Sequence, residues 1–126
     1  MILRIKAPHK DLSDAFVDLS HAVVEAEEEG FALPSDLALA NAKRLLRELY
    51  EIAPQRFEVY PTPDAEIAIR ALAPRRSVIL LCKPEGGAVC LVNLKSGRRR
   101  QSYTPSDILP DSFLKEALLD LKAESD

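Results

Sequence analysis

The chain has 126 residues, of which 47% are hydrophobic and 29% are charged, and its formal net charge is −3. This length and apolar content are typical of a single globular domain, residues 1–126, whereas the negative net charge argues against nucleic-acid binding over the whole surface. Apolar runs such as Val78–Cys82 are too short to span a bilayer, and two cysteines without a signal peptide favour a cytoplasmic protein without a disulfide framework.

Two amphipathic helices are predicted in the first half of the chain, after a short alternating segment, Ile2–Lys6, that is predicted as an edge strand. The first helix covers Asp11–Glu29 and ends at Gly30, which is a favourable C-cap residue. Ser35 is the predicted N-cap of the second helix, Asp36–Ile52. Apolar residues recur at helical spacing at Leu12, Phe16, Leu19, Val23 and Ala26, and again at Leu39, Ala42, Leu46 and Leu49.

Five short strands are predicted in the middle of the chain, separated by turns rich in proline and glycine. Strands this close in sequence pair in antiparallel fashion, because a parallel pair needs a long crossover connection. We therefore expect an antiparallel meander of four or five strands. The predicted strands are Arg56–Tyr60, Glu66–Leu72, Arg76–Lys83, Ala88–Leu94 and Arg98–Tyr103.

The polarity of the strands predicts their places in the sheet. Arg76–Lys83 has an apolar centre on both sides, and Ala88–Leu94 is similar. Both strands are therefore expected to be central, and either covered on both faces or close to an interface. Arg98–Tyr103 is polar and basic, which suits a solvent-facing edge protected by charge.

A last helix, Ser112–Lys122, is predicted after an N-cap at either Asp107 or Asp111. The fold class that follows is α+β, in which the antiparallel meander packs its apolar face against two or three helices. Leu80 in the third strand and Leu118 in the last helix are expected in the core.

Two arginine clusters are the most distinctive surface feature of the sequence. Because successive strand residues point to opposite faces, Arg98 and Arg100 share one face and Arg99 shares the other with Tyr103. Arginine pairs well with carboxylates, so these residues predict a docking site for an acidic partner protein; the alternative is that they simply protect a sheet edge and keep it soluble. The candidate partner-binding residues are Arg75, Arg76, Arg98, Arg99, Arg100 and Tyr103.

The two cysteines, Cys82 and Cys90, flank the predicted hairpin turn at Pro84–Gly87. A loop made of Glu85, Gly86 and Gly87 would place them directly opposite each other, and a loop one residue shorter or longer would place them on opposite faces. Buried free thiols are favoured over a redox pair, because an unpaired cysteine behaves as a small hydrophobic residue.

No pattern in the sequence predicts a catalytic, metal or cofactor site. His9 and His21 have no partner that the sequence places nearby, there is no CxxC pair for zinc, and Gly86-Gly87 suits a hairpin turn and not a phosphate loop. We therefore expect a protein that is not an enzyme and that needs no cofactor.

Part of the chain resembles a loose group of uncharacterised small bacterial proteins. The resemblance rests on the helix that carries Pro34-Ser35 and Ala42–Leu46, and on the turn and strand Tyr60–Ile69, which reads YPTPDAEIAI. The group usually has glycine where this chain has Ala65, and often tryptophan where it has Arg70. The resemblance carries no known activity, but it implies a mobile or defence-linked locus and hence an inhibitor, antitoxin or immunity-type role.

The sequence thus predicts a non-enzymatic module that binds another protein, with no membrane association. Two other functions are left open: contact with nucleic acid through the arginine edge, and a small enzyme or ligand-binding domain with a pocket between sheet and helices. Homo-oligomerisation is also left open.

Overall fold

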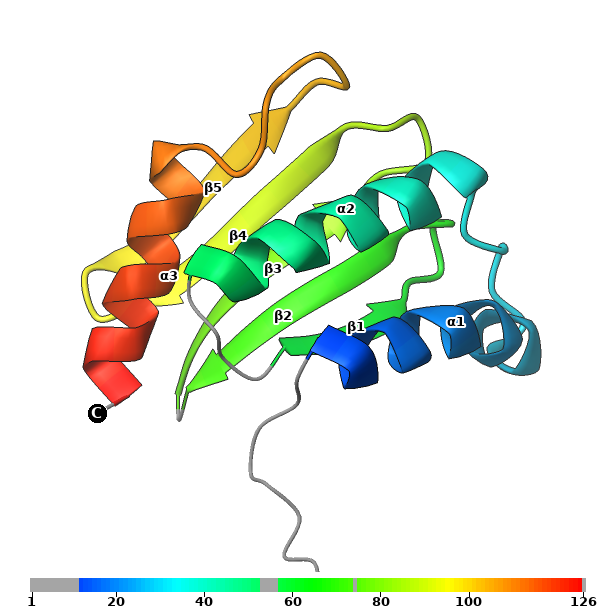
Figure 1. Cartoon of the computed structure of the whole chain (residues 1–126), viewed down its shortest axis with the longest axis horizontal. Helices are drawn as coiled ribbons and strands as arrows, with labels where there is room; N and C mark the ends of the chain where they lie inside the picture. The colour runs from blue at the N-terminus through cyan, green and yellow to red at the C-terminus, as the bar shows by residue number, and fades with distance from the viewer. Residues whose placement is uncertain (1–11, 53–56, 74, 126) are drawn as a thin grey trace, which may run out of the picture.

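The computed structural model describes residues 12–52, 57–73 and 75–125, so the strand predicted at Ile2–Lys6 lies outside the described residues. Two helices, five strands and a third helix follow one another along the chain (Figure 1). They are α1 (Leu12–Glu29), α2 (Asp36–Ile52), β1 (Phe57–Pro61), β2 (Ile67–Ala73), β3 (Arg76–Cys82), β4 (Ala88–Leu94), β5 (Gly97–Tyr103) and α3 (Ser112–Ser125).

The strands form one five-stranded sheet in the order β1-β2-β3-β4-β5, and every neighbouring pair is antiparallel. This arrangement confirms the predicted α+β class and the meander. It also confirms that β3 is central and that the basic strand β5 lies at an edge.

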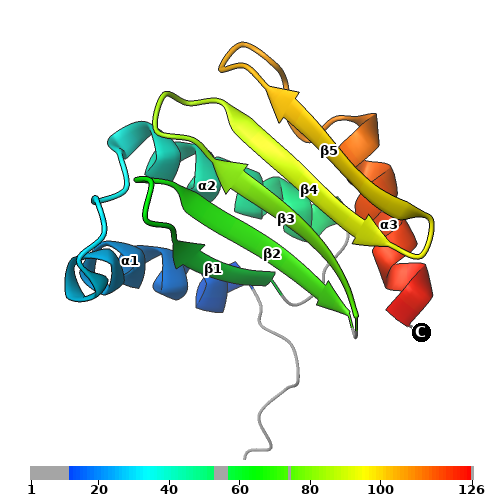
Figure 2. The same cartoon turned by 180° about the vertical axis from the view of Figure 1, so that it is seen from behind.

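All three helices lie on the same side of the sheet (Figures 1 and 2). Helix α1 packs against β1 and α2, helix α2 against β2 and β3, and helix α3 against β2, β3 and β4. The other side, which we call the open face, carries no helix of the described chain. The described helices therefore cover β3 and β4 on one face only, and the predicted alternative, that these strands lie close to an interface, stays a prediction.

The core lies between the sheet and the helices, and it buries the predicted Leu80 and Leu118. Helix α1 differs from expectation, because its buried residues are mostly alanines while Phe16 and Val23 are only half-buried. Short alanine side chains allow α1 to lie close to β1 and α2. The buried residues of α1 are Ala15, Leu19, Ala22 and Ala26.

The N-terminus of α2 is connected by hydrogen bonds to the β3–β4 turn. The Ser35 hydroxyl accepts the Ala38 N–H at 3.1 Å, which confirms it as the N-cap, and donates to the Pro84 carbonyl at 2.8 Å. One turn later, the Asn41 side chain donates to the Gly86 carbonyl at 2.6 Å. These bonds fix the turn against α2, although the turn and the helix are far apart in sequence.

Helix α3 begins at the second of its two predicted caps. Asp111 Oδ1 accepts the Leu114 N–H at 3.0 Å, and the same oxygen accepts the Tyr103 hydroxyl at 2.9 Å. One carboxylate therefore both caps α3 and connects it to the end of β5.

Gly87, at the end of the β3–β4 turn, lies too close to β5 to accept a side chain. A Cβ at this position would lie 2.6 Å from the Tyr103 carbonyl oxygen, which is a backbone atom and cannot rotate away. Gly87→Ala should therefore lower the free energy of unfolding by about 1–3 kcal/mol, measured by urea denaturation. Glu85→Ala, at an exposed position of the same turn, should change it by less than about 0.5 kcal/mol. Equal effects of the two substitutions would contradict the close approach.

Candidate protein-binding surface

A row of side chains crosses the open face from β1 to β5. Successive register pairs align these residues on one line perpendicular to the strands. Charged residues stand at both ends of the row, and the apolar Ile79 and Leu91 lie between them and are half-buried. The row consists of Glu58, Arg70, Ile79, Leu91 and Arg100.

The β1 end of this row is internally neutralised. Arg70 Nε donates to Glu58 Oε1 at 3.0 Å, and the Arg70 guanidinium lies 5.5 Å from the ring centroid of Tyr60. The hydrogen bond to Glu58 raises the pKa of Arg70, so this arginine stays charged and paired. The β1 end therefore offers little free charge to a partner.

The β5 end of the open face carries two exposed arginines without a carboxylate partner among the described residues. Arg98 and Arg100 alternate with Arg99, and their register partners, Asn93 and Leu91, place both on the open face. Arg99 points to the opposite side, where its guanidinium lies 5.4 Å from the ring centroid of Phe113 in α3. The alternation predicted from the sequence is thus confirmed: Arg98 and Arg100 lie together and Arg99 lies apart.

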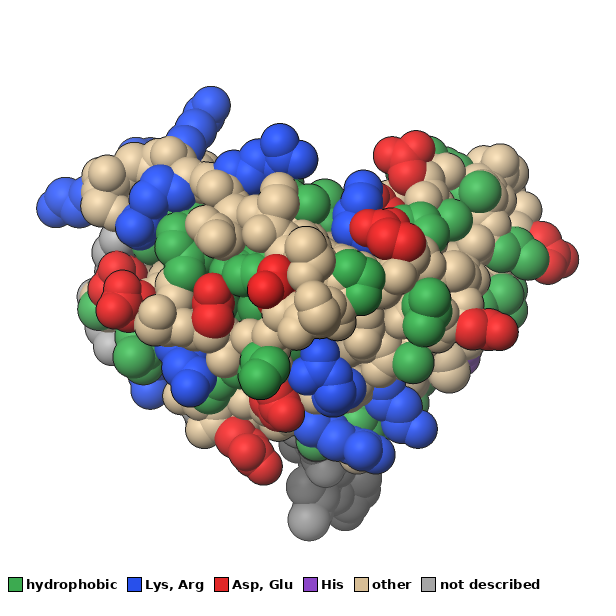
Figure 3. Space-filling model, turned by 90° about the horizontal axis from the view of Figure 1, so that it is seen from above, with side chains coloured by type: hydrophobic (Ala, Val, Ile, Leu, Met, Phe, Trp, Pro, Cys, Tyr) green, Lys and Arg blue, Asp and Glu red, His purple; other side chains and the backbone are tan. Residues whose placement is uncertain are grey.

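A hollow of about 370 Å³ lies beside Arg98 and Arg100. The apolar Ile79 and Leu91 and the polar Ser77 and Asn93 contribute to its walls; the full lining is Ser77, Ile79, Leu91, Val92, Asn93, Arg98, Arg99 and Arg100. In Figure 3, Lys and Arg side chains gather along the upper left of the molecule, apart from most acidic side chains. The surface therefore combines an apolar floor with the charges of Arg98 and Arg100, for which the described residues supply no carboxylate partner.

The other three predicted site residues lie apart from this hollow. Arg75 is exposed in the turn between β2 and β3 with a positive φ of 65°, and its carbonyl accepts a hydrogen bond from the Arg76 guanidinium at 2.9 Å. Tyr103 is buried, and its hydroxyl is engaged by Asp111. Of the six candidates, the structure brings only Arg98 and Arg100 together on the open face.

The sequence reasoning missed the apolar part of this surface. Strand polarity places Ile79 and Leu91 in central strands, and the apolar character of β3 and β4 on both sides is the signal for a covered or contacted face. Glu58 and Arg70 alternate with apolar neighbours in β1 and β2, and the register places both on the open face. The sequence does not reveal that α1, α2 and α3 all pack on the opposite side of the sheet.

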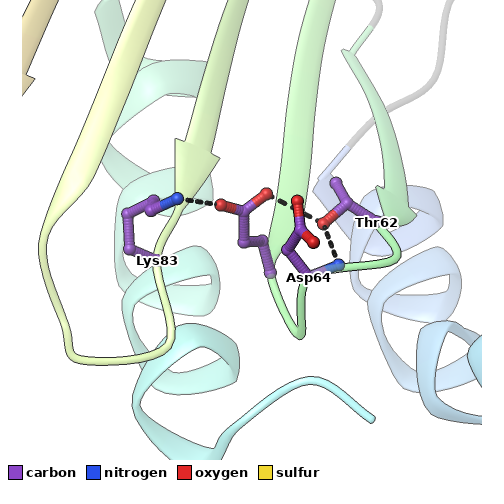
Figure 4. A network of polar contacts seen from close by, with 4 residues as sticks. Thr62, Asp64 and Lys83 are labelled. Atoms are coloured by element: carbon purple, nitrogen blue, oxygen red, sulfur yellow. Dashed lines mark hydrogen bonds and ion pairs between the residues drawn. The ribbon is translucent and has the colours of Figure 1, made fainter. Parts of the chain in front are cut away.

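A second polar cluster surrounds Glu66, a buried charged residue next to the β1–β2 turn (Figure 4). Its Oε1 accepts the Thr62 hydroxyl at 2.8 Å and its Oε2 is paired with the Lys83 ammonium group, while Thr62 Oγ1 also accepts the Asp64 N–H at 3.2 Å. The hydrogen bond to Glu66 raises the pKa of Lys83. Because one oxygen of Glu66 binds Thr62 and the other binds Lys83, this cluster joins the β1–β2 turn to the end of β3.

The two cysteines are buried free thiols, as predicted, but the predicted register alternatives are both wrong. Cys82 pairs with Ala88 and Cys90 with Leu80, so the thiols share the helix-covered face in neighbouring rows. The reason is the turn: five residues, 83–87, separate Cys82 from Ala88, and within them the Lys83 N–H donates to the Gly87 carbonyl at 2.9 Å. Burial raises the pKa of each thiol to about 12, which disfavours the reactive thiolate.

The remaining histidine and acidic residues singled out by the sequence form no further site among the described residues. His21 is exposed on α1, and His9 lies outside the described residues. Asp107 accepts the Thr104 N–H at 2.7 Å within its own loop. Across residues 12–52, 57–73 and 75–125, no three His, Cys, Asp or Glu side chains come together as metal ligands. Over the same residues, no helix is both long and apolar enough to cross a membrane.

Comparisons with models of known protein families, with curated proteins and with solved structures found no match to this chain.

Proposed function

We propose that this chain is a non-enzymatic, cytoplasmic module that binds another protein through the β5 side of its open face. The observation that carries the proposal is the combination of half-buried Ile79 and Leu91 with exposed Arg98 and Arg100 on a face that none of the described helices covers. Apolar side chains in the middle of a sheet gain stability when a second surface covers them. A partner would supply that cover.

The chemistry of the partner follows from the charges. Arg98 and Arg100 form no ion pair within the described chain, and the guanidinium group favours bidentate pairing with carboxylates. The partner surface should therefore be acidic, with an apolar side chain that enters the hollow over Ile79 and Leu91. The resemblance to small bacterial proteins of defence-linked loci supports an inhibitor, antitoxin or immunity-type role for such binding.

Protein is favoured over nucleic acid by the aromatic side chains. Strand-binding proteins stack bases on exposed aromatic rings beside positive charge. Near this surface, Tyr103 is buried and Tyr60 already lies under the Arg70 guanidinium. The net charge of −3 also disfavours the binding of nucleic acid, which is itself negatively charged.

The test is a charge reversal with a matched control. Arg98→Glu with Arg100→Glu should reduce capture of the partner from a lysate of the cells that encode the chain, and should weaken its measured affinity by at least about tenfold, mainly through slower association. Lys43→Glu with Lys115→Glu makes the same change in net charge at exposed helical positions and should leave binding unchanged. Both variants should keep the stability of the parent within about 1 kcal/mol, because exposed charges contribute little to folding.

Three results would speak against the proposal. If both variants lose the same proteins, capture depends on net charge and not on this surface. If neither variant loses any, the arginines only protect the sheet edge. If binding to a random single-stranded DNA is tight, is lost in the arginine variant and disappears at high salt, nucleic acid is the ligand.

A further inference from the structure

The outer edge of β5, beside the arginines of the candidate surface, is a second candidate for binding. β5 is the last strand of the sheet, and within the described chain no strand or helix pairs with its outer side (Figure 2). It is seven residues long and contains neither proline nor an irregular register. Such an edge can pair with an additional strand.

The hydrogen-bond pattern identifies which backbone groups of β5 are free. The Lys83 N–H donates to the Gly87 carbonyl, so these two residues form a hydrogen-bonded pair, and in an antiparallel ladder every second residue pair is hydrogen-bonded. Counting along the register from this pair, the backbone groups of Val89, Leu91 and Asn93 form hydrogen bonds with β3. The residues between them, such as Val92, therefore direct their backbone groups to β5. The N–H and C=O groups of Arg98, Arg100 and Ser102 consequently point outward.

We propose that this edge accepts an extended acidic segment of the partner protein as a sixth strand. The inference rests on the proposed function and specifies its binding mode: main-chain hydrogen bonds supply affinity and side chains supply selectivity. Arg98, Arg100 and Ser102 offer both their free backbone groups and their open-face side chains to the same incoming strand.

The charges select the occupant. In a paired strand, residues opposite Arg98 and Arg100 on the open face lie close enough for ion pairs, so carboxylates at alternate positions of the added strand would be stabilised. A second copy of this chain is disfavoured, because its own β5 would bring three further arginines to the same edge. The edge therefore favours an acidic strand over self-association.

A short peptide tests this mode directly. The probe is a seven-residue peptide of alternating Glu and Val with blocked ends, and the control is the same sequence with alternate backbone nitrogens methylated, so that its side chains stay but one hydrogen-bonding edge is lost. In the free protein the amides of Arg98, Arg100 and Ser102 should exchange with solvent quickly, and those of Arg99 and Gln101 slowly. On addition of the probe, exchange at the first three should slow by about tenfold or more. The methylated peptide should give no such protection.

A proline substitution tests the same edge without changing a charge. Ser102→Pro removes one outward N–H and no bond to β4, because proline is tolerated at an edge where the N–H faces solvent. It should weaken peptide binding by about tenfold or more, whereas Ser102→Ala, which keeps the N–H, should bind like the parent. Exchange measurements on the unmodified protein decide the question if Ser102→Pro fails to fold.

The outcomes separate this inference from the proposed function. Peptide binding without protection of the three outward amides, or no peptide binding at millimolar concentration, would overturn strand addition. If the arginine reversal still abolishes partner capture in that case, docking on the open face stands without it. A concentration-dependent dimer that protects the same amides without peptide would identify a second copy as the occupant, and would also overturn the inference.

Discussion

Leu80→Ala should lower the free energy of unfolding by about 2–5 kcal/mol, the range expected for a large-to-small substitution in a well-packed core. Leu80 lies in the central strand, is 2% exposed, and faces the helices between Ile69 and Cys90. Rigid strands on both sides limit how far the structure can relax into the vacated volume. Urea denaturation monitored by circular dichroism should show a lower midpoint with an unchanged slope.

The neighbouring residue provides the control for this experiment. Leu81 lies in the same strand but on the open face, where it is half-buried. Leu81→Ala should therefore cost clearly less than Leu80→Ala, since the side chain already contacts solvent and leaves no closed cavity. Equal losses for the two variants would mean that the open face is covered in solution to the same extent as the core.

The strands were predictable because local signals agreed with one another. Alternation in Phe57–Pro61 and Ile67–Ala73 and turn residues between the strands all indicate antiparallel hairpins, and short hairpins leave few other topologies. The cap residues Ser35 and Asp111 marked helix starts for the same local reason. Information within a few residues was sufficient at these places.

The register of the cysteine hairpin was not predictable from the residue types alone. The Pro84-Glu85-Gly86-Gly87 segment permits several loop lengths, and each shifts the pairing. The structure selects one in which Gly86 adopts a positive φ of 102° and donates its N–H to Lys83 O at 3.1 Å. The bond from Asn41 on α2 to the Gly86 carbonyl contributes to this choice, and a contact so distant in sequence gives no local signal.

The candidate surface was predictable in part. The alternation of side chains along a strand predicts that Arg98 and Arg100 lie on the same face of the sheet. It does not predict whether that face is the open one or the one that the helices cover. β3 and β4 are apolar on both sides, so periodicity does not distinguish the side that α2 and α3 cover from the side that stays open. That distinction depends on where the helices pack, which is a property of the whole fold.

The buried thiols make the stability of this protein sensitive to alkaline pH. Cys82 and Cys90 are both fully buried, and burial raises the pKa of each thiol from 9.0 to about 12. A thiol whose pKa is higher in the folded than in the unfolded state stabilises the fold fully below pH 9. As the pH rises from 9 towards 12, the unfolded chain releases its protons first, so stability is progressively lost.

The expected loss is large for two thiols in a chain of this size. Each rise of one pH unit above 9 lowers the free energy of unfolding by about 1.4 kcal/mol per thiol. By pH 11 the two thiols together lower it by about 5 kcal/mol, a substantial share of the 5–15 kcal/mol typical of a domain. Urea denaturation at pH 8, 9, 10 and 11 under reducing conditions would measure it. The matched variant is Cys82→Ser with Cys90→Ser, which keeps the side-chain size and removes both titrating groups.

The difference in unfolding free energy between the parent and the double variant isolates the contribution of the two cysteines. Tyr103, whose pKa is raised mainly by burial and by its hydrogen bond to Asp111, titrates in both proteins, so most of its contribution cancels in the comparison. The parent should lose its advantage over the double variant steadily above pH 9, while below pH 8 the difference should be constant. Titration of the unreduced, denatured parent should count two free thiols. A stability difference that does not change between pH 8 and 11 would mean that solvent reaches the thiols in the folded state, and the packing of β3 and β4 against the helices would then be looser than the structure indicates.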